Sequence, residues 1–203
     1  MSEHAPWPPY FRSSIREHFH ATGVLIANWQ TVEDANHALF QILNSANVSF
    51  AFHAYDLLSN ESRFKILRAE LPRVIGDHYG SAIEHYLESA KIGLDNRNAI
   101  AHAALGPHND PAFLKVRKGV DKTRTFIRQY TFSLRSLRRM ADQTYITGIY
   151  GFQIFRHFTM AQASPPQGDA ASWQAQIKQL EPWSNMPPLP ERWETLSEPA
   201  KPE

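Results

Sequence analysis

The chain has 203 residues, of which 42% are hydrophobic and 20% charged, and its formal net charge at pH 7 is +1. This length allows one domain with an ample core, the near-balanced charge indicates no class of partner, and no apolar run reaches the roughly 20 residues that cross a bilayer. The absence of cysteine excludes disulfides, thiolate zinc sites and cysteine nucleophiles, and with no basic-then-apolar leader at the N-terminus we expect a cytoplasmic protein without a membrane partner.

The N-terminal third is expected to form an extended arm followed by one long helix. Residues 1–9 contain three prolines and lack a helical pattern. From about Tyr10 to about Asn44 a single apolar stripe keeps its phase, which predicts one helix instead of two. The residues that recur every seven positions in this stripe are Leu25, Val32, Leu39 and Ala46.

Glu33 lies on this first helix and has two interpretations. It could take part in catalysis or orient Arg97. The simpler interpretation is that it is an exposed or ion-paired helix residue, since most surface carboxylates on helices have no further role.

Two shorter elements follow. Residues 48–58 alternate partly between apolar and polar but end like a short helix. Ser59 or Asn60 is then expected to cap a further helix. Pro72 should end that helix or begin the next one, because proline removes a helical hydrogen bond.

A helix from about Ser81 leads into the stretch 95–105, where reactive side chains lie among small, helix-favouring residues. Asn98 and His102 are four positions apart and therefore share one helix face. Arg97 precedes Asn98, and its long stem can bring the guanidinium to the imidazole. The alanines that would let a second helix approach closely are Ala99, Ala101, Ala103 and Ala104.

Gly106-Pro107 is expected to end this helix, and a β-hairpin should follow at about 112–130. Its two strands alternate apolar and basic residues, which predicts one wet, basic face. Ser133 should then cap a final long helix that runs to about Met160.

Positive charge is concentrated in this part of the chain. Nine of the 21 basic residues lie between Ala112 and Arg139, against the single acid Asp121. Such a segment attracts phosphate groups, although a merely solvated face is the alternative. The residues that we expect to bind RNA are Lys115, Arg117, Lys118 and Arg124.

The C-terminal segment 161–203 differs in composition. Eight of the 14 prolines lie between Pro165 and Pro202, and one short helix is expected from Ala170 to Leu180. The segment also holds three tryptophans, which a purely solvated tail seldom carries. We therefore expect this tail to wrap the domain or a partner subunit.

The string from Arg97 to His102 has four residues between the arginine and the histidine, with the polar Asn98 directly after the arginine. This pattern resembles the Arg-x4–6-His motif of the HEPN superfamily. The helix segment 23–34, with its Trp29 and Glu33, resembles the long first helix of bacterial members. The likeness extends as an architecture over about residues 20–160, and its specific motif is the hexapeptide alone.

The resemblance implies a mainly all-α fold: an antiparallel helical bundle with a small β-hairpin insertion and a Pro-rich C-terminal tail. It also implies a homodimer acting as a metal-independent ribonuclease, often within toxin–antitoxin or phage-defence systems, so that an antitoxin or other protein partner is conceivable. Residue by residue, it assigns Arg97 and His102 to catalysis and Asn98 to the polar position beside them. The expected organisation is an arm at 1–9, a helical domain at 10–160 and a tail at 161–203.

The chemistry of these residue types agrees with that implication. Cleaving RNA without metal needs a base for the ribose 2′-hydroxyl, which neutral histidine supplies, and a cation for the phosphorane, which arginine supplies. A two-fold dimer would bring two copies of each into one cleft. We expect no cofactor and no metal site, because the histidine pairs His18/His20 and His78/His85 lack a completing ligand at helical spacing.

Two other interpretations of the motif stay open. In the first, the chain is a non-catalytic helical dimer that binds nucleic acid or a protein partner through the basic hairpin and the tail. In the second, His102 caps a helix or packs in a core and Arg97 is a solvated ion-pair partner or stabilises a subunit interface.

Overall fold

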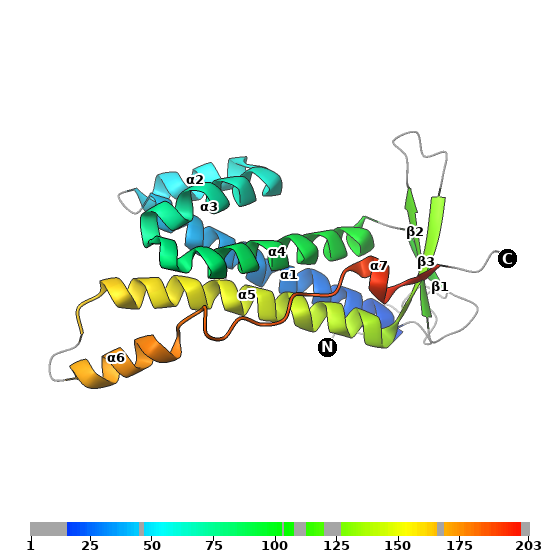
Figure 1. Ribbon diagram of the computed structural model, residues 1–203. Helices are drawn as coiled ribbons and strands as arrows, with labels where there is room; N and C mark the ends of the chain where they lie inside the picture. The colour runs from blue at the N-terminus through cyan, green and yellow to red at the C-terminus, as the bar shows by residue number, and fades with distance from the viewer. Residues whose placement is uncertain are drawn as a thin grey trace, which may run out of the picture.

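The computed structural model describes residues 16–44, 47–102, 104–107, 113–119, 127–165 and 169–199. These residues form a helical bundle that carries a small antiparallel sheet at one end (Figure 1). The helices are α1 (Arg16–Leu43), α2 (Val48–Leu57), α3 (Asn60–Ile75), the 3-10 turn η2 (Asp77–Tyr79), α4 (Gly80–Ala101), α5 (Leu134–Gln162), α6 (Ala170–Gln179) and α7 (Trp193–Leu196). The strands are β1 (Ala104–Pro107), β2 (Phe113–Gly119), β3 (Ile127–Ser133) and β4 (Glu198–Pro199). The expected mainly all-α class is confirmed.

Three long helices form the centre of the bundle. Helix α1 is unbroken, as the phase of its apolar stripe predicts, and it packs along α5. The two run in the same direction, because Glu17 pairs with Arg138 near their starts and Thr31 contacts Gly148 further along. Helix α4 runs in the opposite direction and carries the motif back to the sheet end of the bundle (Figure 1).

Of the two candidate caps Ser59 and Asn60, Ser59 is the one in the structure, and the expected cap at Ser133 is confirmed. The Ser59 hydroxyl accepts a hydrogen bond from the Ser62 backbone N–H at 3.2 Å, and Ser133 does the same for Ser136 at 3.0 Å. We expected Pro72 to end α3 or to begin the next helix. Instead, α3 continues through Pro72 to Ile75. The Pro72 carbonyl still accepts from the Gly76 N–H at 2.9 Å, so the helix completes one more turn.

The end of α4 also differs from expectation. The helix ends at Ala101, well before Gly106-Pro107, and residues 104–107 form the edge strand β1. Pairing with β2 is the reason, since Leu105 lies opposite Val116 and Pro107 opposite Leu114. Proline is tolerated there because an edge strand leaves one row of backbone groups unpaired.

The predicted hairpin is present as β2 and β3, and the sheet order is β1-β2-β3-β4. The outer strand β4 comes from the tail, and its Glu198 lies opposite Thr131. Both outer strands therefore come from segments that we did not predict as strands.

The tail follows the bundle and packs on the chain's own helices (Figure 1). The Tyr150 hydroxyl donates to the Pro182 carbonyl at 3.1 Å, and His85 Nε2 lies 2.7 Å from the Pro187 carbonyl oxygen. Trp183 packs edge-to-face on Tyr79, and burial raises the pKa of that tyrosine to about 12. The expected packing of this segment on the domain is therefore present.

The sheet end of the bundle has its own apolar core. This cluster joins the starts of α1 and α5, the end of α4, strand β3 and the tail; its buried members are Ala21, Leu25, Ala99, Ile100, Phe132, Leu137, Met140, Ala141 and Trp193. Burial at these positions fixes the last turn of α4 against four other segments. Within the described ranges, no helix combines the length and the apolar character that a membrane span requires.

Candidate functional site

The motif residues lie together at the C-terminal end of α4. Arg97 Nη1 donates to Asn98 Oδ1 at 2.9 Å and lies 3.2 Å from His102 Nε2. His102 is the C-cap residue, and its backbone N–H bonds to the Asn98 carbonyl at 3.3 Å. The helical spacing expected from the sequence thus brings the three side chains into one cluster.

The contact between Arg97 and His102 has one possible direction. A guanidinium carries only donors, so His102 Nε2 is the acceptor. This geometry places an imidazole beside a permanent cation.

His102 is exposed at the helix end, so it is not a packed core histidine. Arg97 and Asn98 are half-buried, and the Arg97 Nε atom is buried without a hydrogen-bond partner among the described residues. This nitrogen is enclosed by the protein, so Arg97 would contact an anionic group through the outer nitrogens of its guanidinium.

The alanine face expected to receive a second helix is partly occupied. Ala99 is 1% exposed and packs with Ile100 in the core at the sheet end. It therefore offers no surface to a second chain. Ala101 is half-buried, and the side chains of Ala103 and Ala104 lie outside the described residues.

Glu33 does not orient Arg97. Its carboxylate accepts from Trp29 Nε1, from the Tyr55 hydroxyl and from Arg63 Nη1, each at 2.9 Å. Arg63 also lies over the Tyr55 ring, 3.9 Å from its centroid. Burial, together with the neighbouring Glu33 carboxylate, raises the pKa of Tyr55 well above its ordinary range. Glu33 is thus an ion-paired residue that ties α1 to α2 and α3.

The four residues expected to bind RNA are placed only in part. Lys115, Arg117 and Lys118 lie on β2 by their backbone, while their side chains and all of Arg124 lie outside the described residues. Two other basic residues between Ala112 and Arg139 form ion pairs with acidic residues: Arg138 with Glu17 at 2.9 Å, and Arg139 with Glu191. These pairs remove part of the positive field that the sequence suggests for the start of α5.

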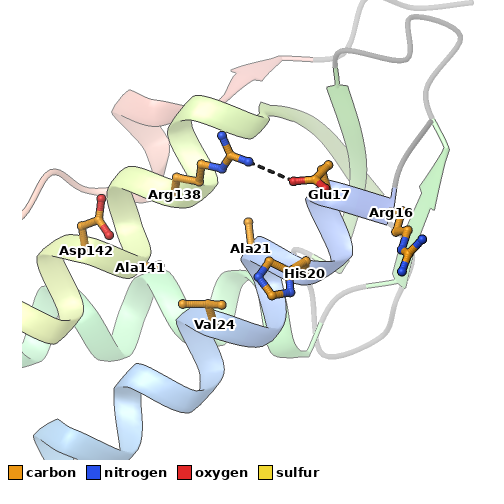
Figure 2. A pocket seen from close by; sticks show the side chains of 8 residues that line it. All are labelled: Arg16, Glu17, His20, Ala21, Val24, Arg138, Ala141 and Asp142. Carbon is orange, nitrogen blue, oxygen red and sulfur yellow. Dashed lines mark hydrogen bonds and ion pairs between the residues drawn. The ribbon is translucent and has the colours of Figure 1, made fainter. Parts of the chain in front are cut away.

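A pocket of about 470 Å³ lies between the starts of α1 and α5 (Figure 2). Its volume is in the range of small-molecule sites. Its walls carry both signs of charge and include the Glu17–Arg138 ion pair, and its lining residues are Arg16, Glu17, His20, Ala21, Val24, Arg138, Ala141 and Asp142. None of the predicted site residues lines it. His20 faces this pocket whereas His18 is buried, which separates the pair that we considered as metal ligands.

Asn96 is a residue that the sequence analysis did not single out. It is 1% exposed, and its side chain bonds to two backbone groups of the tail. The tail segment that Asn96 binds lies about one hundred residues further along the chain, so no local pattern indicates this contact. The only feature of the sequence that could have drawn attention to Asn96 is its position next to Arg97.

Among the described residues, no three histidine or acidic side chains are grouped as a metal site would require. No family model, curated protein or solved structure matches the chain.

Proposed function

We propose that the chain is a metal-independent endoribonuclease of HEPN type that cleaves RNA through Arg97 and His102. The observation that carries the proposal is the 3.2 Å approach of Arg97 Nη1 to His102 Nε2 at the end of α4, with Asn98 bonded to the same guanidinium nitrogen. A toxin or phage-defence role, with an antitoxin as partner, is what the resemblance to that superfamily adds.

The reaction follows from the two side chains. A phosphate oxygen replaces His102 Nε2 as the acceptor of the Arg97 Nη1 donor, which frees Nε2 to take the proton of a ribose 2′-hydroxyl while the 2′-oxygen attacks the adjacent phosphorus. The bond from phosphorus to the 5′-oxygen breaks, and the imidazolium returns a proton to that oxygen. The products are a 2′,3′-cyclic phosphate and a 5′-hydroxyl. Arg97 donates to the non-bridging phosphate oxygens, where negative charge accumulates in the transition state. Asn98 holds the Arg97 guanidinium at its present position or binds a phosphate oxygen.

A single arginine and a single histidine are few for this reaction. In the proposed homodimer, a two-fold axis near the end of α4 brings a second Arg97–His102 pair into the same cleft. The exposure of His102 supports this arrangement, because the imidazole is open to a second molecule.

The second candidate function keeps the fold without the catalysis. In this function the helical dimer binds nucleic acid or a protein through the basic hairpin and the tail. The Arg97–His102 motif then has only a structural role. The density of basic residues between Ala112 and Arg139 favours this reading.

Purified protein incubated with mixed RNA in EDTA distinguishes the two functions. The ribonuclease yields fragments with 2′,3′-cyclic phosphate ends, because its chemistry uses no metal. Binding without fragments at several pH values, with folded dimer confirmed, would leave the binding function as the only one of the two.

The basic segment gives a separate prediction. We expect RNA binding to weaken when Lys115, Arg117, Lys118 and Arg124 are all changed to glutamine. The negative slope of log affinity against log salt should become shallower by about 3. Fluorescence anisotropy with a labelled single strand at several salt concentrations measures the slope. The matched control replaces four bases of α3 and α4 with glutamine: Lys65, Arg68, Arg73 and Lys91. Equal slopes in the hairpin variant and the control would mean that the hairpin face is only solvated.

A further inference from the structure

We infer that Asn96 and Trp193 are positioning residues for the Arg97–His102 pair. They act through residues 191–199 of the tail, here called the tail clamp, which bind the last turns of α4 and the sheet that follows it. The inference rests on the proposed function for its catalytic consequence, while the mechanical part stands on the contacts themselves.

Both polar atoms of the Asn96 side-chain amide form hydrogen bonds to the tail clamp. Asn96 Nδ2 donates to the Glu191 carbonyl at 2.8 Å, and the Trp193 backbone N–H donates to Asn96 Oδ1 at 2.7 Å. The Asn96 side chain is 1% exposed. Its two hydrogen bonds fix its own χ angles and the backbone conformation of the tail residues that it contacts. No other residue type of this size offers a donor and an acceptor in this arrangement.

Trp193 fills the space beneath the same turn. It is 7% exposed and belongs to the apolar cluster that contains Ala99 and Ile100. Its ring meets the Tyr130 ring edge-on, with centroids 4.8 Å apart. The clamp therefore contacts α4 through this apolar cluster and β3 through the Tyr130 ring.

The other residues of the tail clamp connect the site to the sheet and to α5. Strand β4 pairs with β3, β3 with β2 and β2 with β1, and β1 begins two residues after His102. The backbone N–H of Glu191 donates to Gln143 Oε1 at 3.1 Å, which ties the clamp to α5. The site thus lies between two anchored points: Asn96, immediately before Arg97, and β1, which begins two residues after His102.

This position matters for catalysis because proton transfer and phosphate contact depend on sub-ångström placement of the two side chains. Arg97 is adjacent to Asn96, so a shift of Asn96 moves the guanidinium with the backbone. A loosened last turn would also release the His102 backbone N–H from the Asn98 carbonyl.

The test compares full-length variants for RNA cleavage and for amide hydrogen exchange over residues 97–102. For Asn96→Ala and Trp193→Ala we expect kcat to fall about tenfold or more, KM to stay within about twofold, and exchange in the last turn of α4 to rise. Trp193→Phe should restore most of kcat, since it refills the space. Asn96→Asp keeps the acceptor for the Trp193 N–H and loses the donor to Glu191, so an intermediate loss is expected if Asn96→Ala does not fold.

The matched control is Tyr150→Phe, which removes one buried hydrogen bond to the tail, at Pro182, away from the motif. We expect it to leave kcat and the exchange of 97–102 unchanged. The same loss in Tyr150→Phe as in Asn96→Ala would overturn the inference, because general attachment of the tail would then be the cause. Unchanged exchange and kcat in Asn96→Ala would overturn it as well. If the parent protein cleaves no RNA, the proposed function fails, and the exchange measurement alone decides whether the clamp holds the turn.

Discussion

His102→Ala is expected to abolish RNA cleavage while leaving the thermal midpoint of unfolding nearly unchanged. Removing the base from such a reaction lowers the rate by about 10²- to 10⁴-fold. The imidazole is exposed, so its loss should change the free energy of unfolding by less than about 0.5 kcal/mol. Cleavage of a labelled RNA in EDTA measures the rate, circular dichroism melting measures the thermal midpoint, and the molar mass in solution shows whether the oligomeric state is unchanged.

Arg97→Ala tests the same site from the side of the cation. Losing a charge-assisted donor to the phosphorane should lower the rate by about 10²- to 10³-fold. In the proposed dimer we expect this change also to raise stability, since two facing guanidiniums repel each other. The matched control is His53→Ala, which removes an exposed histidine from α2. Cleavage that survives in both motif variants, or falls equally in the control, would return the motif to an architectural role.

Gly151→Ala is expected to lower the stability of the helical bundle markedly. A Cβ at Gly151 would lie 2.5 Å from Tyr86 Cε2 and 2.8 Å from the Ala35 Cβ. Tyr86 is fully buried, and its hydroxyl donates to Asn36 Oδ1 at 2.9 Å, so the ring cannot move without breaking that bond. Overpacking of this kind costs about 1–3 kcal/mol. Urea unfolding followed by circular dichroism measures the loss.

Gly23→Ala, on α1 of the same chain, is the control for Gly151→Ala. A Cβ at Gly23 meets nothing within 4 Å, and the position is exposed. Alanine should therefore stabilise the helix by up to about 1 kcal/mol. Equal effects of the two substitutions would show that α1 and α5 do not approach closely at Gly151.

Local rules predict much of the bundle. The apolar stripe of α1 predicts one unbroken helix, and the hydroxyls of Ser59 and Ser133 predict two helix starts that the fold confirms. Each of these depends on neighbours within a few positions. The same holds for the hairpin of β2 and β3, whose strands are close in the chain.

Local rules fail where a distant segment decides. Residues 104–107 follow a helix and contain a Gly-Pro pair that suggests a stop, yet they pair with β2. The tail residues 198–199 have no strand pattern, yet they pair with β3. An edge strand takes its conformation from the partner's unpaired backbone groups, which the sequence of the edge itself does not encode.

At the candidate site, residue spacing is enough to predict that Arg97, Asn98 and His102 share the end of one helix, because a helix places residues four and five apart within reach of each other. The gathering of basic residues between Ala112 and Arg139 can likewise be read directly from the chain. The packing of the folded chain is needed to find that Glu33 pairs with Arg63 instead of Arg97, and that Asn96 binds the tail. Such contacts join side chains 30 and 95 positions apart, and their partners are chosen by how helices and tail pack, which no short-range periodicity specifies.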